Sequence, residues 1–299
     1  MITERPRGLL VPVTTPFDPT TGDVAPVHLR DNARAALAAG AAGIVAAGST
    51  GEASLLSESE FRQVVAWMRD VCPDDRWLVA GSGRESTRAT IEACRVAGEA
   101  GADAALVRAP SYYGPVFTTA SLTDHFWAVA DASPIPVILY NFPRYTHVAL
   151  TPQLVAALAT HENIWGAKDS SGDLKVFAAF REAAPNWSLF VGPGALFYPA
   201  LELGAAGAIA AVACFAAGPT VAIYQAFDRG DRAASGAAQE RVAPLHRVIV
   251  GELGVPGIKL AMDIVGLFGG SPRPPIPAIA DKDRRRVADL LREAELPHS

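Results

Sequence analysis

Ten residues in the second half of the chain combine an apolar strand, a lysine and a polar turn: Ile164-Trp165-Gly166-Ala167-Lys168-Asp169-Ser170-Ser171-Gly172-Asp173. A helical pattern follows from about Leu174. Most lysines lie on solvated surfaces, so a lysine that closes a buried strand is unusual. If this strand belongs to a parallel barrel, its carboxyl end lies at the mouth, where such barrels carry their chemistry.

Lys168 therefore has two interpretations. Burial disfavours the charged form of an amine, and a neutral amine can attack a carbonyl carbon and form a Schiff base. The alternative is a surface lysine that merely follows a strand, which is the commoner case because perturbed lysines are rare. The other strands of the chain decide between the two.

Composition narrows the class of protein. The chain has 299 residues, half of them apolar, which suits one large α/β barrel or two ordinary domains. A net charge of −5 leaves no basic footprint for nucleic acid. No run is long and apolar enough to span a bilayer, the N-terminus has no signal-peptide core, and the histidines lack metal-ligand spacing. Cys72, Cys94 and Cys214 form no CxxC pair, which is typical of a reducing cytoplasm.

Short apolar segments alternate with helical patterns along the first two thirds of the chain. The predicted strands are residues 9–13, 44–47, 77–80, 104–107, 137–140, 164–168, 189–191 and 208–211. Ser57 with Glu60 predicts a capping box, and Thr151 before Pro152 predicts another helix start. This alternation predicts an α/β fold, a (β/α)₈ barrel over residues 1–218. Residues 219–299 show only helical patterns and turns, and we expect them to form a C-terminal helical extension packed on the barrel.

Polar residues gather where four predicted strands end. They are Gly48-Ser49-Thr50-Gly51-Glu52, Tyr112-Tyr113, Tyr140-Asn141-Phe142-Pro143 and Lys168. A Schiff-base enzyme needs an amine, a phenol that moves protons, and N–H groups that hold a carboxylate. Taken singly, a strand-end tyrosine is usually packing, and Gly-x-x-Gly turns are common. Their joint occurrence on successive strand ends favours the chemical interpretation.

These motifs resemble the dihydrodipicolinate synthase / N-acetylneuraminate lyase family of class I aldolases. The resemblance extends to the Gly257-Ile258-Lys259-Leu260 segment and to Arg273-Pro274-Pro275 near the end of the chain, and it covers about residues 8–296. It implies a TIM barrel with C-terminal helices and a lysine imine formed with pyruvate or another 2-oxo acid. It implies no metal or other cofactor.

The resemblance also assigns roles. It implies that Lys168 forms the imine, that Tyr140 relays protons over it, and that Ser49 and Thr50 with Gly48 bind the carboxylate and assist the relay. Tyr113 is similar to the tyrosine that completes the relay in a neighbouring subunit. Ile209 matches the residue whose backbone carbonyl lies near the imine lysine.

Two departures concern the aldehyde acceptor. Where true dihydrodipicolinate synthases carry an arginine two residues after the Tyr-Asn-x-Pro motif, this chain has Tyr145. Arg144 lies one position early, and we expect an adjacent residue to face elsewhere unless a local shift of the loop brings it into the arginine's place. The acidic residues that sialic acid lyases place after the strand-seven glycine are missing from Gly192-Pro193-Gly194-Ala195. The acceptor half of the pocket is therefore expected to be less polar, with Tyr145 lining it, and the protein is expected to be a poor dihydrodipicolinate synthase.

The resulting hypothesis is a cytoplasmic Schiff-base lyase or aldolase for pyruvate or a related 2-oxo acid, with 4-hydroxy-tetrahydrodipicolinate synthase the best-known candidate activity. The alternatives are a sugar-acid (2-keto-3-deoxy) aldolase or dehydratase, and a hydratase-aldolase with a less polar aldehyde. A different class is a member of the fold that binds a 2-oxo acid without turnover. The expected partners are the 2-oxo acid, an aldehyde and further copies of the chain, as a dimer or homotetramer. We expect no nucleic acid and no membrane partner.

Overall fold

The computed structural model describes residues 4–297. Eight parallel strands form a closed barrel, in which each strand pairs with its neighbours in sequence and β1 closes on β8. The strands are β1 (Gly8–Pro12), β2 (Gly43–Ala46), β3 (Trp77–Gly81), β4 (Ala104–Arg108), β5 (Val137–Asn141), β6 (Ile164–Asp169), β7 (Ser188–Val191) and β8 (Gly207–Ile209). The predicted (β/α)₈ barrel is confirmed.

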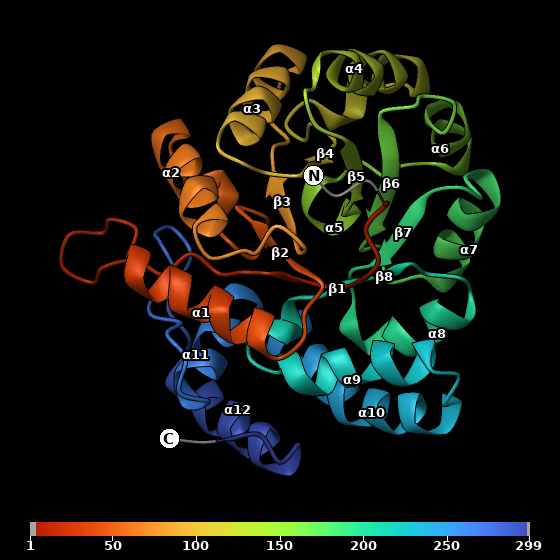
Figure 1. Ribbon diagram of the computed structural model, residues 1–299. Helices are drawn as coiled ribbons and strands as arrows, with labels where there is room; N and C mark the ends of the chain where they lie inside the picture. The colour runs from red at the N-terminus through yellow and green to blue at the C-terminus, as the bar shows by residue number, and fades with distance from the viewer. Residues whose placement is uncertain (1–3, 298–299) are drawn as a thin grey trace.

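Helices surround the strands as a ring in Figure 1, and α9, α10 and α12 lie on one side of it. The helices are α1 (Pro26–Ala38), α2 (Glu58–Arg69), α3 (Thr87–Glu99), α4 (Thr119–Ala132), α5 (Pro143–Thr146), α6 (Pro152–Leu158), α7 (Leu174–Ala183), α8 (Phe197–Glu202), α9 (Ala217–Asp228), α10 (Arg232–Leu245), α11 (Gly254–Ile264) and α12 (Asp281–Glu293). Short 3₁₀ turns are η1 (Ala53–Leu55), η2 (Gly114–Val116), η3 (Gly194–Leu196) and η4 (Ala211–Cys214), and η5 (His246–Glu252) is a π-helix. Within residues 4–297, no helix has the length and apolarity to cross a membrane.

Local signals placed two helix starts correctly and one strand end incorrectly. Ser57 and Glu60 form the predicted capping box, and Thr151 caps α6 with its side chain. The last strand, expected to reach residue 211, ends at Ile209, and η4 begins at Ala211. Alanine has a strong helical preference, so an alanine run cannot by itself extend a strand.

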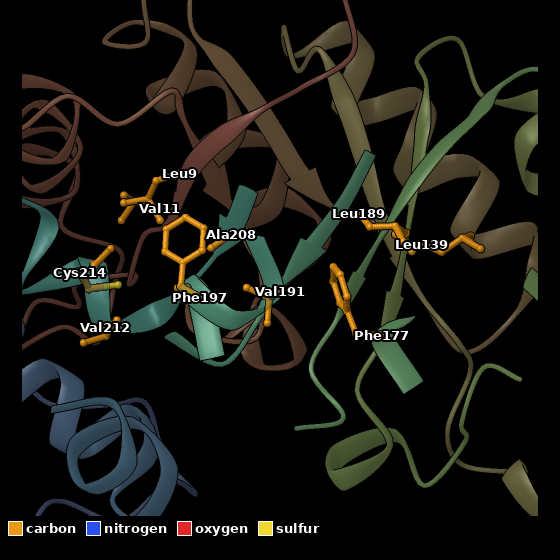
Figure 2. Close-up of a cluster of buried hydrophobic side chains, with 14 of the residues drawn as sticks. Leu9, Val11, Leu139, Phe177, Leu189, Val191, Phe197, Ala208, Val212 and Cys214 are labelled. Carbon is orange, nitrogen blue, oxygen red and sulfur yellow. The ribbon is translucent and has the colours of Figure 1, made fainter. Parts of the chain in front are cut away.

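Alternate strand residues face two different cores. The outer core lies between strands and helices, and Figure 2 draws Leu9, Val11, Leu189, Val191 and Ala208 from the strands with Phe177 of α7 and Phe197 of α8. The barrel interior is filled by the residues in between, including Leu10, Ile138, Tyr140, Phe190 and Ile209. This alternation, which is general for barrels, places Lys168 inward because Ala167 belongs to the outer core.

The C-terminal helices share the outer core of the barrel. Val242 and Leu245 of α10, Ile249 of η5 and Ile258 of α11 are buried in the same cluster as the strands. Pro244 lies inside α10 and lacks the N–H that would continue the helical ladder. The π-helix η5 begins two residues later, at His246. The division of the chain at residue 218 stays a prediction.

Candidate active site

Strand register brings Lys168 beside Tyr140. In the barrel Tyr140 of β5 is the register partner of Lys168 of β6, which in turn pairs with Phe190 of β7. The Lys168 Nζ atom lies 4.2 Å from the centroid of the Tyr140 ring. Each of the two residues is 6% exposed. The Lys168 amine therefore lies over the face of the Tyr140 ring, and both side chains are largely buried at the carboxyl end of the strands.

A cavity of about 400 Å³, which we call the lysine cavity, opens over these two residues. The predicted site residues that line it are Ser49, Thr50, Tyr140, Tyr145, Lys168 and Ile209. Gly48 does not line it, but it precedes Ser49 directly. Tyr113 is not in its wall and is 65% exposed. Six of the eight predicted residues are thus brought together within one chain.

Buried polar contacts to Gly51 and Glu52 hold the loop that carries Ser49 and Thr50. Thr15 donates a hydrogen bond through its hydroxyl to the carbonyl of Gly51, at 2.7 Å. Glu52 adopts a left-handed backbone conformation (φ 56°), and its buried carboxylate pairs with Lys259 of α11. The Lys259 ammonium also donates to the Thr15 carbonyl, at 2.9 Å. Burial lowers the pKa of Lys259, while the charge of Glu52 opposes that shift.

A second buried pair joins the ends of β5 and β6. The Asn141 amide donates to the Asp169 carboxylate at 2.7 Å, and the Ser171 hydroxyl donates to its other oxygen at 2.7 Å. The Asn141 side-chain oxygen accepts from the Leu150 backbone N–H. Burial raises the pKa of Asp169, although these hydrogen bonds act in the opposite direction. The pair links the ends of the two strands that carry Tyr140 and Lys168. The sequence signal for this role is that Asn141 and Asp169 directly follow Tyr140 and Lys168.

A second cavity of about 530 Å³ adjoins the first, and the two share Ser49, Tyr140 and the acceptor-side residues. Tyr145 lies in the short helix α5, with its ring 4.4 Å from that of Phe142, and lines both cavities. Arg144 lines both as well, so of the two alternatives for this residue the structure has the one in which it reaches the acceptor side and does not face elsewhere. Its Nη1 atom donates to the Gly251 carbonyl at 3.0 Å, because α5 turns this side chain toward η5.

One cavity residue was not singled out by the sequence. His246, the first residue of η5, lines the lysine cavity and accepts a hydrogen bond at Nδ1 from the Gly194 backbone N–H, at 3.2 Å. Burial, followed by the charge of Arg247, lowers the pKa of His246 to about 4. The only sequence signal was Pro244, which interrupts a helical pattern close to this histidine.

The loop after β4 is held by Glu85. Its carboxylate accepts from the backbone N–H groups of Ser111 and Tyr112, at 2.8 and 2.9 Å, and pairs with Arg108 at 2.8 Å. Burial opposes ionisation of this carboxyl, but the hydrogen bonds from Tyr112 and Ser111 prevail and lower the pKa of Glu85 to about 2. The loop presents Tyr112 and Tyr113 to solvent, 80% and 65% exposed.

A closed parallel barrel with a buried lysine facing the cavity at its mouth defines a class, the barrel lyases that act through an amine. The model of the Dihydrodipicolinate synthetase family matches residues 5–294 of this chain. A 4-hydroxy-tetrahydrodipicolinate synthase from Methanopyrus kandleri is 36% identical over 96% of this chain and 94% of its own length.

Solved structures agree with this match. A chloride-inhibited dihydrodipicolinate synthase from Acinetobacter baumannii, complexed with pyruvate, superposes with a TM-score of 0.92 and 31% identity over 97% of this chain and 99% of that one. A prophage protein of the same family from E. coli K12, also in complex with pyruvate, gives a TM-score of 0.91 and 28% identity over 97% and 99% of the two chains.

The chain belongs to the dihydrodipicolinate synthetase family. It is accordingly a class I lyase that forms a Schiff base, similar to dihydrodipicolinate synthase.

Proposed function

We propose that Lys168 is the residue that forms the imine. Its amine attacks the carbonyl carbon of pyruvate or a related 2-oxo acid, and water leaves to give the imine. Loss of a proton from C3 converts the imine to an enamine, which adds to an aldehyde, and hydrolysis frees the amine. The observation that carries this proposal is that Lys168 lines the cavity beside Tyr140.

The positions of the other lysines support Lys168 as the residue that forms the imine. The sequence contains four lysines. Lys175 and Lys282 are exposed, and Lys259 is buried in its ion pair with Glu52. Lys168 alone of the four lines the lysine cavity.

We assign proton transfer to Tyr140, with Ser49 as the next member of the relay. A phenol can donate a proton to the hydroxyl that leaves the carbinolamine and later accept one back. Thr50 and the backbone at Gly48 are proposed to hold the carboxylate of the 2-oxo acid, and the Ile209 carbonyl to face the imine. Burial of Thr50, which is 9% exposed, supports a site from which bulk water is largely excluded.

For the acceptor, we propose L-aspartate 4-semialdehyde and therefore 4-hydroxy-tetrahydrodipicolinate synthase activity. The names of the curated relatives support this choice over the sugar-acid and hydratase-aldolase alternatives. Arg144, which lines both cavities, supports it too. Its guanidinium can bind the acceptor's carboxylate and so stand in for the arginine that this chain lacks at position 145.

We further propose that the chain works in the cytoplasm as a homo-oligomer, a dimer or a tetramer. The exposed pair Tyr112 and Tyr113, fixed by Glu85, supports a contact in which Tyr113 reaches a neighbouring subunit's site. Cys72, Cys94 and Cys214 are free and buried, which supports a reducing compartment.

Steady-state assays of pyruvate with L-aspartate 4-semialdehyde test the proposed activity. The expected kcat/KM is ~10⁴ M⁻¹s⁻¹ or higher, the ordinary range for an enzyme on its own substrate. Turnover of pyruvate with other aldehydes but not with this one would leave the imine chemistry in place and overturn the acceptor. If the protein binds pyruvate and turns over none of the aldehydes, it is the non-catalytic member of the fold.

A further inference from the structure

We propose that His246 binds the acceptor aldehyde: its Nε2–H group donates a hydrogen bond to an oxygen of the acceptor other than the reacting carbonyl. The inference rests on the proposed function, because it concerns the aldehyde that the Lys168 enamine attacks. It adds a substrate-binding residue from the C-terminal helical region to a site whose other assigned residues come from the strand ends and the short helix α5.

The hydrogen bond at the other ring nitrogen decides which tautomer is present. The Gly194 backbone N–H can only donate, so His246 Nδ1, 3.2 Å away, must be unprotonated. A neutral ring then carries its proton on Nε2. Within residues 4–297, Nε2 has no hydrogen-bond partner and is not sealed from solvent. His246 and Lys168 line the same cavity, so the imidazole brings to the lysine cavity a donor without a protein partner among the described residues.

The segment that positions this donor is rigidly held. Gly194 donates to His246 through its N–H and accepts through its carbonyl from the Gln239 amide, at 3.0 Å. Gln239 in turn accepts from the Tyr198 backbone N–H, at 2.8 Å. A side chain at Gly194 is excluded, because a Cβ atom there would lie 2.6 Å from Val212. The orientation of the imidazole therefore does not depend on a ligand.

The wall of the lysine cavity is largely apolar. The apolar residues that line the lysine cavity with His246 include Pro193, Ala195, Leu196, Val250 and Val255. In an apolar pocket, a few placed polar groups orient the ligand. With the pKa of His246 lowered to about 4 by burial, the donor is uncharged near neutral pH, in contrast to the guanidinium of Arg144. The π-helical turn that presents it is a backbone form often found at functional sites.

Two substitutions distinguish the contributions of the two ring nitrogens of His246. His246→Asn places an amide oxygen near the Nδ1 position, which keeps the Gly194 contact and removes the donor at Nε2. His246→Gln places an amide nitrogen near Nε2 and keeps the donor. The measured quantity is the kcat/KM for 3-hydroxypropanal divided by that for propanal, at saturating pyruvate. The two aldehydes differ only in one hydroxyl, which the donor can bind.

The wild type is expected to prefer 3-hydroxypropanal. In His246→Asn the ratio should fall about three- to tenfold, the effect of one neutral hydrogen bond, while His246→Gln stays within about twofold of the wild type. A wild-type ratio near one contradicts the inference. An unchanged ratio in His246→Asn also contradicts it. If His246→Asn lowers kcat/KM for both aldehydes equally, the role of His246 is structural and the inference is again contradicted.

A second readout does not require turnover. In enzyme labelled with ¹⁵N-histidine and reduced with borohydride on pyruvate, 3-hydroxypropanal should shift the His246 Nε2 resonance and propanal should not; equal responses contradict the inference. Trapping of pyruvate itself should be equal in the wild type and both variants. Failure of the wild type to be trapped overturns the proposed function, whereas normal trapping with no acceptor effect overturns only the role of His246.

Discussion

The Lys168 Nζ atom lies 4.2 Å from the centroid of the Tyr140 ring, and the two residues are register partners on adjacent strands. A one-residue slip between β5 and β6 would turn one of them out of the barrel, because side chains alternate between its two faces. The register irregularity between Val137 and Ile138 lies earlier in β5, so the pairing from Ile138 to Asn141 is continuous through the site. The relative position of Lys168 and Tyr140 is therefore set by the pairing of the two strands.

Tyr140→Phe is expected to slow turnover with little change in pyruvate binding. The ring and its packing remain and only the phenolic hydroxyl is lost, and losing its proton transfer should lower kcat by ~10²–10⁴-fold. Steady-state kinetics together with a pyruvate binding isotherm measure both quantities. A variant within about threefold of wild-type kcat, less than 1 kcal/mol of barrier, would place Tyr140 among the packing residues.

Arg144→Ala is expected to lower kcat/KM for L-aspartate 4-semialdehyde by about ten- to a hundredfold, because a charge-assisted hydrogen bond contributes ~1.5–3 kcal/mol. The KM for pyruvate should stay the same. The double variant Arg144→Ala/Tyr145→Arg moves the guanidinium to the neighbouring position and should restore part of the loss. Equal activity of wild type and Arg144→Ala on this aldehyde would remove Arg144 from the acceptor site.

Tyr113 is expected to act in a neighbouring subunit. Tyr113→Phe and Lys168→Ala should each be nearly inactive alone. Mixed oligomers of the two should regain activity, because one site in the pair then has both residues. The test is co-refolding followed by assay, with sedimentation velocity to confirm mixing. Glu85→Ala, which releases the Ser111–Tyr112 backbone, should weaken association; mixed oligomers without activity would refute the shared site.

Stability is expected to decrease as the pH falls from about 6.5 to about 4. Burial lowers the pKa of both His125 and His246 to about 4, below the ordinary value of 6.5. In that window the unfolded chain binds protons that the folded chain does not, so the free energy of unfolding decreases. His125 contributes on the order of 3 kcal/mol at most. The free energy of unfolding of His125→Gln, measured by urea denaturation at several pH values in this range, should depend less steeply on pH than that of the wild type. An unchanged pH dependence would contradict the assignment.

The sequence predicted the barrel well because its strands are apolar and short and its loops are marked by glycine. The sequence also predicted that Ser49, Tyr140 and Lys168 lie close together, since parallel strands in a barrel all end at one mouth. The end of the last strand was missed because Ala208 to Ala211 is compatible with either structure.

The acceptor side was less predictable, because it depends on contacts between distant segments. Arg144 faces the cavities because α5 forms a single turn there and Gly251 of η5 accepts its hydrogen bond. His246 reaches the site through a π-helix that no periodic pattern predicts. Both contacts join residues that are more than 50 positions apart in the chain.

Mapping of the covalent adduct shows directly whether Lys168 forms the imine. The enzyme is incubated with pyruvate, reduced with borohydride, digested, and the modified peptide identified by mass spectrometry, with Lys168→Ala as the control. We expect one adduct, on Lys168, and none in the variant, which should keep its fold by circular dichroism. An adduct on Lys175 or Lys259 with none on Lys168 would contradict this expectation.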